Sequence, residues 1–477
     1  MTRTAPLDLL GIGIGPFNLS LAALCDGVPG LRAEFLEARP DFRWHPGLLV
    51  DGAMMQVPFL ADLVSLVDPT SRWSYLAYLR AHDRLFPFYF SERLHLPRRE
   101  YDHYCRWAAR SLPSCRFGAE VTAVRWDAAD GCYEVTHAQG TSRARALVLG
   151  VGTEPAVPEP LAPLLVEERV LHSAAYLDGR EGLAGARDIT VLGSGQSGAE
   201  IFLDLLRAHA RTTGPALDGQ AAGTEVRLRW LTRTRAFAPM EYSKLGLEQF
   251  TPDHTRAFHA LPQQAKDRVV PSQWQLYKAA SAETLAEIHD ALYERTIGGA
   301  PAPVDLLPDH AVTAAAAVPG PEGRPRYRLR LRHGATGAET ALTTEALVLA
   351  TGHTARRPAF LDPLADLLDL DEQGRYRVDA QYRVATRAGL AGPLHVQNAE
   401  LHTHGVGAPD LGLGAWRAAV ILNALAGRTV HRLPQRTAFT TFTPASPATS
   451  AAPVASGTDS HRPASTLESD RASAHLT

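Results

Sequence analysis

Cysteine is scarce in this chain of 477 residues, which contains four cysteines, Cys25, Cys105, Cys115 and Cys132. They show no C-x-x-C spacing and have no histidine-rich pattern beside them, so the sequence supports neither a dithiol redox centre nor a metal site. We therefore expect reduced, structural thiols and no bound metal.

The chain also lacks a strong net charge and a long apolar run. Its net charge of −3 argues against nucleic acid or an anionic membrane as the main partner. No apolar run reaches the roughly 20 residues that cross a bilayer, and the N-terminal residues lack the basic-then-apolar order of a signal peptide. We expect a cytoplasmic protein of ordinary globular composition with two or three domains.

What the sequence does contain is a glycine-rich turn near its start. The stretch Leu7–Ser20 runs from an apolar segment through Gly13 and Gly15 into a segment with helical apolar spacing. This order is typical of a dinucleotide-binding strand, turn and helix, in which the pyrophosphate approaches the helix N-terminus. The third glycine position is Asn18, but a second apolar segment ends at Glu37, where such folds place a carboxylate for the ribose hydroxyls.

A complete G-x-G-x-x-G follows much later, at Gly193–Gly198, between an apolar strand pattern and an apolar-periodic helix. This context predicts a second dinucleotide site. The next strand pattern has no acidic residue at its end and leads to Arg233 and Arg235. Their guanidinium groups favour NADPH over NADH because they can pair with the 2′-phosphate; the alternative is that both arginines are merely solvated.

The sequence therefore predicts an α/β protein with two Rossmann-like dinucleotide-binding domains, for FAD and NADPH, and a smaller, mainly helical substrate region. Residues 1–185 and 341–433 would form the FAD-binding domain. Residues 186–340 would form the NADPH-binding domain, with the helical substrate insertion at about 236–300. The segment 434–477 is dominated by Ala, Ser, Thr and Pro, which predicts a disordered and dispensable tail.

Several motifs together carry a family resemblance. They are Gly13-x-Gly15-Pro16-x-x-Leu19, the WHPG and MQVPFLADLVSLVDPTS segments, Gly193–Gly198, the ATG at Ala350–Gly352, and His404-Gly405 with Asp410–Leu413. With these motifs the chain resembles the flavin-dependent N-hydroxylating monooxygenases, which act on lysine, ornithine and aliphatic diamines for hydroxamate siderophores. Among them it is most similar to the putrescine and cadaverine type.

Proteins of related construction fit less well. A disulfide reductase would need a redox cysteine pair. A Baeyer–Villiger or sulfide-oxidising monooxygenase would carry F-x-G-x-x-x-H-x-x-x-W/Y, of which only His172 and Tyr176 remain. A non-catalytic protein that senses the NADPH and FAD redox state is an alternative from a different class, but it would not require the long irregular insertion at 40–74.

The resemblance implies that NADPH reduces FAD, that oxygen adds to the flavin, and that the resulting C4a-hydroperoxide hydroxylates a primary amine. A small-molecule amine and O2 are thus the expected partners, and we also expect a homo-oligomer. Two residues are the catalytic candidates: Gln56, which motif matching places beside the flavin, and Asn398, one of three asparagines in the chain, which comes just before the flavin-facing loop. The residues expected to bind the cofactors are Gly13, Gly15, Pro16, Phe17, Asn18, Glu37, Trp44, His45, Gln56, Asp410, Leu411, Gly412 and Leu413 for FAD, and Gly193, Ser194, Gly195, Gln196, Ser197, Gly198, Arg233 and Arg235 for NADPH.

Three departures from the family pattern bear on the substrate. Relatives that hydroxylate lysine or ornithine carry a lysine in F-L-K-D-L, an asparagine ahead of E-x-F-x-P, and a serine after D-L-G-L. The corresponding residues here are Ala61, Leu247 and Gly414. A substrate carboxylate would lose its polar anchors against such groups, which favours a diamine such as putrescine or cadaverine.

The far ammonium of a diamine needs an anionic partner, for which Glu241, Asp62 and Glu248 are candidates. Lys244 could instead supply a relocated cation for a substrate carboxylate. It keeps L-lysine, or L-ornithine, as the alternative substrate.

Overall fold

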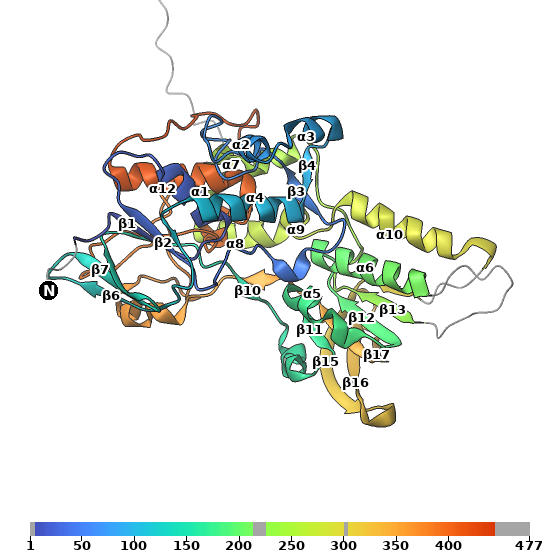
Figure 1. The fold of residues 1–477 in the computed structure, drawn as a ribbon. Coiled ribbons are helices and arrows are strands. Elements are labelled where there is room, and N and C mark those ends of the chain that lie inside the picture. The colour runs from blue at the N-terminus through green and yellow to red at the C-terminus, as the bar shows by residue number, and fades with distance from the viewer. Residues whose placement is uncertain (1–4, 213–225, 300–303, 444–477) are drawn as a thin grey trace, which may run out of the picture. The chain divides into compact units, whose positions relative to one another are not determined.

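The computed structural model describes residues 5–212, 226–299 and 304–443. Its first sheet has five parallel strands in the order β20-β9-β1-β2-β5. The last of these in the sequence, β20, comes from the C-terminal part of the chain. Figure 1 shows β1 and β2 of this sheet beside α1. The strands are β1 (Leu9–Ile12), β2 (Ala33–Leu36), β5 (Cys115–Arg116), β9 (Leu147–Leu149) and β20 (Leu394–Val396).

Three helices lie beside this sheet: α1 (Pro16–Cys25), α4 (Arg98–Ser111) and α12 (Gly414–Ala426). Helix α1 packs against both of the others. It has no polar face because its residues from Asn18 to Cys25 are all buried. In α4, by contrast, Tyr101 and Tyr104 form the buried face and the charged residues lie mostly on the other, as expected of an amphipathic helix.

A second parallel sheet has the strand order β11-β18-β12-β13-β14. Both of its faces are buried. Ala346 and Val348 join a core with residues of α6 and α10, whereas Leu347 and Leu349 join a core with residues of β16. Such two-sided burial explains why these strands read as continuous apolar runs. The strands are β11 (Val170–His172), β12 (Asp188–Leu192), β13 (Arg227–Leu231), β14 (Val304–Leu307) and β18 (Ala346–Leu349).

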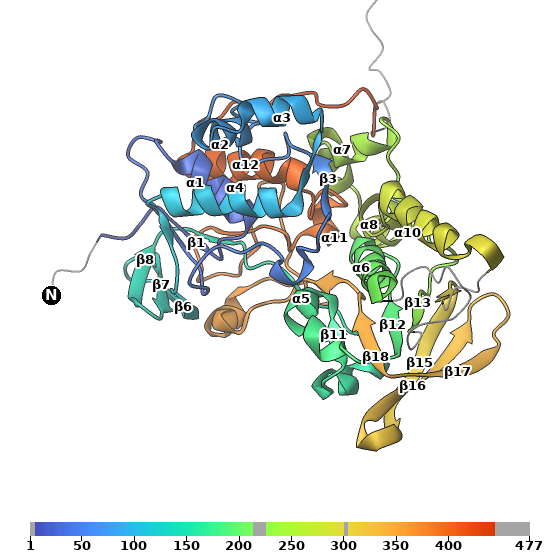
Figure 2. The same cartoon turned by 45° about the vertical axis from the view of Figure 1, so that its right-hand side comes forward.

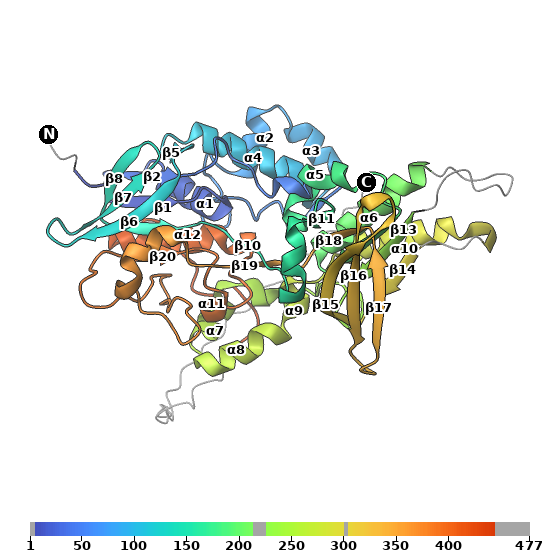
Figure 3. The ribbon, with the colours of Figure 1, turned by 90° about the horizontal axis from the view of Figure 1, so that it is seen from below.

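Helices α6 (Gln196–Thr212) and α10 (Ala282–Arg295) lie side by side on this second unit (Figure 2). Each parallel sheet is accompanied by a three-stranded antiparallel sheet (Figure 3). These are β6 (Val121–Asp127), β7 (Cys132–His137) and β8 (Gly140–Ala144) in the first unit, and β15 (His310–Pro319), β16 (Pro325–His333) and β17 (Glu339–Thr344) in the second.

Two passages of chain join the units, and they run beside each other. In these passages β10 (Glu154–Pro155) pairs antiparallel with β19 (His353–Thr354). The boundaries expected at 185 and 341 therefore need correction, because β11 and β18 are hydrogen-bonded into the second sheet. The second unit lies between Pro155 and His353. The predicted boundaries were wrong because an apolar strand followed by glycine has the same sequence pattern in either sheet.

The substrate insertion expected at 236–300 is helical. It contains the 3₁₀ turn Gly246–Phe250 and the helices α7 (Pro252–His259), α8 (Gln263–Ser272) and α9 (Trp274–Tyr277) ahead of α10. Helices α7 and α8 pack against α11 (Leu401–His404), which belongs to the first unit. The remaining short elements near the cavity are β3 (Met54–Pro58), β4 (His95–Pro97), α2 (Tyr75–Ala81), α3 (Leu85–Ser91) and α5 (Tyr176–Gly179).

The predicted start of the disordered tail, at 434, needs correction. The carboxylates of Asp253 and Glu248 accept hydrogen bonds from backbone N–H groups of residues 437–440 at 2.6–3.0 Å. Arg256 also donates to the carbonyl oxygen of Gln435 at 2.7 Å. The folded chain thus extends beyond 434, and the rest of the predicted tail, 444–477, lies outside the described residues. In the described part of the chain, no helix is long and apolar enough to cross a membrane.

Candidate functional site

A cavity of about 4440 Å³ extends from the first glycine turn to the second. Both glycine motifs, the segment around Gln56 and the loop at Asp410 contribute to its wall. The cavity therefore brings together motifs that are far apart in the sequence.

The first glycine turn is shaped by close backbone contact. Gly13 has a φ of +87°, and a Cβ there would lie 2.5 Å from the carbonyl oxygen of Gly150. Gly15 precedes α1. A Cβ added to Gly15 would have one neighbouring atom within 4 Å, the carbonyl oxygen of Gly150 at 3.9 Å. No side chain caps α1. The helix N-terminus is therefore open to an anionic group, as a dinucleotide pyrophosphate requires.

Asn18, expected to contact the cofactor, lies behind the turn. It is fully buried and does not line the cavity. Its Nδ2 donates to the carbonyl oxygens of Gly13 (2.8 Å), Ile12 (3.2 Å) and Val148 (3.3 Å). The correction has a physical reason, because a side chain with this many backbone partners holds the turn in shape and cannot reach a ligand.

Glu37 directly follows β2, on the cavity wall. One carboxylate oxygen accepts from the N–H of Ile14 at 2.8 Å, and the other accepts from the N–H of Arg39 at 3.1 Å. Each oxygen retains a lone pair, so the carboxylate is placed to accept hydrogen bonds from ribose hydroxyls.

Trp44 and His45 also line the cavity. The N–H of Trp44 donates to Asp102 at 2.7 Å, and its ring packs edge-on against Tyr101. His45 has a left-handed φ of +45°. Burial, and then the neighbouring His353, lowers the pKa of His45 to about 4, so the ring is neutral near pH 7.

The loop before α12 presents Asp410, Leu411 and Gly412 to the cavity. Asp410 accepts from the N–H of Gly412 at 2.7 Å, and burial raises its pKa to about 6. Leu413 and Gly414, expected to face the flavin and the substrate, do not line the cavity. Leu413 is buried in the core, and a Cβ at Gly414 would lie 3.3 Å from the ring of Phe17.

The second glycine motif forms the opposite part of the wall. A Cβ at Gly193, where φ is +114°, would lie 2.1 Å from the carbonyl oxygen of Ala350. Gly198 does not line the cavity, because it packs against the carbonyl oxygen of Gly193. The other four residues of the motif, Ser194, Gly195, Gln196 and Ser197, line it.

The two arginines after β13 differ in position. Both are exposed, but Arg233 lines the cavity and Arg235 does not. Lys278, which the sequence analysis missed, lines the cavity too; burial, and then the charge of Arg233, lowers its pKa. No local sequence signal marks Lys278, since it lies 45 residues beyond Arg233 in a helical segment.

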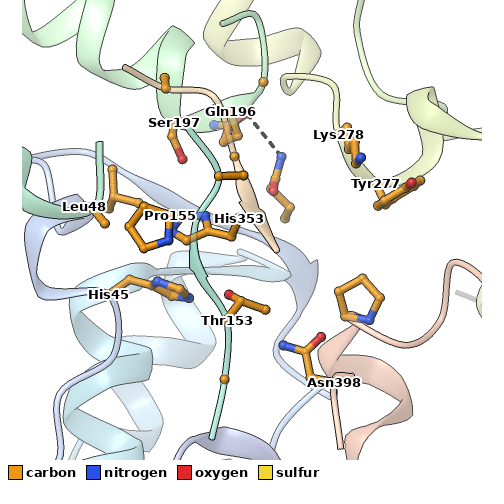
Figure 4. Close-up of a pocket in the computed structure, with 18 of the residues that line it drawn as sticks. His45, Leu48, Thr153, Pro155, Gln196, Ser197, Tyr277, Lys278, His353 and Asn398 are labelled. Atoms are coloured by element: carbon orange, nitrogen blue, oxygen red, sulfur yellow. Dashed lines mark hydrogen bonds between the residues drawn. The ribbon is translucent and has the colours of Figure 1, made fainter. Parts of the chain in front are cut away.

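Gln56 and Asn398 both reach the cavity. Nε2 of Gln56 donates to Oε1 of Gln196 at 3.2 Å, across the boundary between the units. Asn398 has a left-handed φ of +64°, and Figure 4 shows it with Thr153 among the residues that line the cavity. The same view shows Gln196, Lys278 and His353 around this part of the cavity.

Ala61 is buried on the cavity wall, 3.9 Å from the position of a Cβ at Gly412. Lys244 and Leu247 line the cavity as exposed residues, whereas Glu241 is exposed and lies outside it.

Two of the expected ammonium partners are already engaged. Asp62 is buried and accepts from Val64, Ser65 and Tyr75 at 2.6–2.9 Å. Glu248 accepts from the backbone near the end of the described chain. Neither lines the cavity. The sequence could not show this, because the partners of Tyr75 and of residues 439–440 are set by the tertiary fold.

The described residues fit two dinucleotide cofactors. Each glycine turn leads into a helix, α1 or α6, and Glu37 supplies a ribose acceptor only in the first. The first site therefore fits FAD. The second has Ser194, Arg233 and Lys278 on its wall and fits a dinucleotide with an additional phosphate, as in NADPH.

Comparison with known proteins gives concordant matches. The family model for L-lysine 6-monooxygenase/L-ornithine 5-monooxygenase matches residues 5–355. The rhizobactin siderophore biosynthesis protein RhbE of Rhizobium meliloti is 42% identical over 446 residues, covering 91% of this chain and 94% of that protein. A putrescine N-hydroxylase of Shewanella oneidensis is 38% identical over 443 residues, covering 92% and 84% respectively.

Solved structures agree. DfoA of Erwinia amylovora, the cadaverine monooxygenase of the desferrioxamine pathway bound to FAD, has a TM-score of 0.85 at 38% identity, covering 93% of this chain and all of that one. The Kutzneria sp. 744 ornithine N-hydroxylase KtzI, with reduced FAD, NADP⁺ and L-ornithine, has a TM-score of 0.78 at 26% identity, covering 89% and 99%. These matches confirm the predicted α/β fold with two Rossmann-like units.

Proposed function

The chain belongs to the L-lysine 6-monooxygenase/L-ornithine 5-monooxygenase family of flavin-dependent N-hydroxylating enzymes, and we propose that its substrate is an aliphatic diamine. FAD and NADPH are the cofactors. The amine, O2, NADPH and a proton give the hydroxylamine, water and NADP⁺. Putrescine and cadaverine are the proposed diamines, for hydroxamate siderophore biosynthesis, in keeping with the names of the relatives.

One observation supports a diamine most directly. Ala61 occupies the position at which lysine- and ornithine-hydroxylating relatives carry a lysine, and here it is only 6% exposed on the cavity wall. A substrate carboxylate beside this methyl group would be buried without a cation. A diamine has no carboxylate and avoids that cost.

Asp410 is the proposed partner of the far ammonium. Asp62, Glu241 and Glu248 do not line the cavity, whereas Asp410 does, and it lies two residues from Gly412, which faces Ala61. Its raised pKa reflects burial without an adjacent cation strong enough to offset it. An ammonium group beside Asp410 would restore the favourable pairing.

The chain's residues support the chemistry by binding and orientation. FAD, when bound, transfers electrons from NADPH to O2. Glu37 and the first glycine turn would hold it, and Gln56 and Asn398 would orient groups at the reaction centre. An alkylammonium has a pKa of about 10.4 in water, so the reacting nitrogen must lose its proton; the apolar walls at Leu60, Leu66 and Leu411 favour the neutral amine.

A substrate panel tests this proposal. Hydroxylamine formed and NADPH consumed are measured with putrescine, cadaverine, diaminopropane, L-lysine and L-ornithine. We expect a higher kcat/KM for putrescine or cadaverine than for either amino acid. An equal or higher value for lysine or ornithine would favour the alternative in which Lys244, on the cavity wall, binds a carboxylate. If no amine yields hydroxylamine, the redox-sensor alternative stands.

We also propose a cytoplasmic homo-oligomer. Helix α3 exposes Phe86, Tyr89 and Phe90 to 73–76%, and such a group of large apolar side chains favours self-association. The four cysteines are unpaired, as the reducing cytoplasm favours. Sedimentation at several protein concentrations tests the association.

A further inference from the structure

A buried ion pair connects the two units beside the cavity. Arg98, at the start of α4, donates to Glu200 of α6 at 2.8 Å, and the two side chains are 11% and 6% exposed. Nε of Arg98 also donates to the carbonyl oxygen of Met54 at 3.2 Å, in the strand that carries Gln56. Because a buried charge that loses its partner is costly, this pair constrains β3 and α6 together.

Glu200 transmits the constraint to Gln196. Oε1 of Glu200 accepts from Nε2 of Gln196 at 2.7 Å. Oε1 of Gln196 accepts from the backbone N–H of Ser281 at 2.7 Å, and its Nε2 also donates to Thr284 at 3.1 Å. An ionised carboxylate can only accept and a backbone N–H can only donate, so these partners fix the orientation of the Gln196 amide.

The fixed amide of Gln196 in turn sets that of Gln56. Since Oε1 of Gln196 can only accept, Gln56 must face it with Nε2, at 3.2 Å. The same nitrogen lies 3.0 Å from the sulfur of Met240. Both N–H groups of Gln56 are thus engaged, and its carbonyl oxygen accepts no hydrogen bond from the described residues, although Gln56 lines the cavity. Gln56 presents a hydrogen-bond acceptor there.

We propose that Arg98 and Glu200 are positioning residues, which act through Gln196 to hold the carbonyl oxygen of Gln56 toward the cavity and to keep the two cofactor-binding units in register. The contacts close a ring from Arg98 through Glu200, Gln196 and Gln56 back to Met54. The acceptor suits an N–H donor, which is either the substrate amine or an N–H of FAD. The effect on hydroxylation rests on the proposed function, whereas the effect on cofactor binding does not.

Glu200→Gln is the sharpest test. The new amide nitrogen must face either Arg98 or Nε2 of Gln196, and both of these are donors. Gln196 would reorient, and Gln56 would lose its fixed direction. We expect the hydroxylamine formed per NADPH consumed to fall at least threefold, with a matching rise in hydrogen peroxide, and the bound-flavin absorption spectrum to shift.

The ion pair of Arg207 and Glu287 provides the matched control. It also involves α6, which it joins to α10 instead of α4, but its side chains are 45% and 51% exposed. Glu287→Gln should therefore leave coupling and the flavin spectrum unchanged. If Glu200→Gln folds poorly, Arg98→Lys retains the buried cation but loses the second contact with Met54, and it should give a smaller change of the same kind.

A double-mutant cycle separates positioning from general support. In a Gln56→Ala background, Glu200→Gln should have little further effect on the hydroxylamine formed per NADPH consumed (the coupling), because the Gln56 amide that it positions is absent. Additive losses, or unchanged coupling in Glu200→Gln, would overturn the proposal. A change in the FAD dissociation constant would assign the donor to the flavin, and a change in amine KM alone would assign it to the substrate.

Two readouts do not depend on hydroxylation. NADP⁺ titration of the oxidised protein and the flavin spectrum both report on the ring of contacts even if no amine in the panel is hydroxylated. Weaker NADP⁺ binding in Glu200→Gln than in Glu287→Gln is expected. If the diamine proposal fails, the positioning role of Arg98 and Glu200 can still be tested. If that positioning role is disproved, the diamine proposal is unaffected.

Discussion

The side-chain amide of Gln397 donates to Oδ1 of Asn18 at 2.7 Å, although 379 positions separate the two residues. Asn18 stands where the glycine motif would have its third glycine, and its own amide holds the carbonyl oxygens of Ile12, Gly13 and Val148. One side chain therefore fastens the first turn to β1, β9 and the residue that follows β20. Asn18 thus shapes this turn at the position where the motif would have its third glycine.

Asn18→Asp tests this role. A carboxylate would place an acceptor against three carbonyl oxygens in a fully buried position. We expect the free energy of unfolding to fall by about 3 kcal/mol or more and FAD to be lost, measured by urea denaturation and flavin content. Asn423→Asp is the control, because its oxygen accepts two backbone N–H groups and would keep them, and the new acceptor would face one carbonyl oxygen, that of His431, instead of three. Equal losses in both variants would contradict the assignment.

The arginines after β13 make a second prediction. Arg233→Gln should weaken NADPH binding more than NADH binding, since a phosphate-paired guanidinium contributes about 1.5–3 kcal/mol. Arg235→Gln should leave the preference unchanged, because Arg235 does not line the cavity. The ratio of kcat/KM for NADPH to that for NADH measures both. The opposite ranking would place the 2′-phosphate at Arg235.

Asp410 predicts a pH dependence of stability. Burial raises its pKa from 3.8 to about 6, so the folded protein holds this proton more tightly than the unfolded chain. Its contribution to stability is greatest below pH 4 and is lost as the pH rises through 6. Asp410→Asn keeps the acceptor for Gly412 but cannot ionise. Urea denaturation from pH 4.5 to 8 should show the variant gaining about 2 kcal/mol of stability relative to wild type. A constant difference would contradict the raised pKa.

Ala61→Lys makes the fourth prediction. A lysine at this buried position would add a cation to the cavity wall. We expect kcat/KM for putrescine and cadaverine to fall at least tenfold, because two ammonium groups would then compete for one region, and relative activity on L-lysine or L-ornithine to rise. Ala61→Met, of similar length without the charge, is the control. Equal effects of both variants would show that size alone matters.

The fifth prediction concerns the end of the described chain, residues 435–443. Truncation after Gln435 removes the N–H groups that bind Asp253 and Glu248, whereas truncation after Thr443 keeps them. We expect the first truncation to lower the melting temperature and the second to leave it, FAD content and turnover unchanged. Equal melting temperatures for the two truncated proteins would show that these contacts add nothing.

Local patterns carried most of the fold prediction. The glycine turns, the apolar strands and the helices that follow the turns are each encoded by neighbouring residues, and they lie where the sequence indicates. One strand could not be assigned to its sheet from local patterns: β18 was predicted in the FAD-binding domain, at 341–433, but lies in the second sheet. Its apolar run and following glycine resemble those of β9, and only pairing with β11 and β12 distinguishes them.

The site shows the same limit. Asp62 and Glu248 look like free carboxylates in the sequence, but the fold supplies them with donors from α2 and from the end of the described chain. Arg98 and Glu200 are 102 positions apart, and nothing local marks them as a pair. Hydrogen-bond and ion-pair partners that are far apart in the chain and meet only in the folded protein cannot be predicted from a single sequence.

The paired passages β10 and β19 also set an order of assembly. Every strand of the second parallel sheet lies between them, so that sheet can close while later residues are still being synthesised. The first sheet must wait for β20, 245 positions after β9, before Gln397 can reach Asn18. On the ribosome, we therefore expect the second parallel sheet to form before the pocket that begins at the N-terminus, and a nascent chain released early would hold that sheet beside an unfinished flavin site.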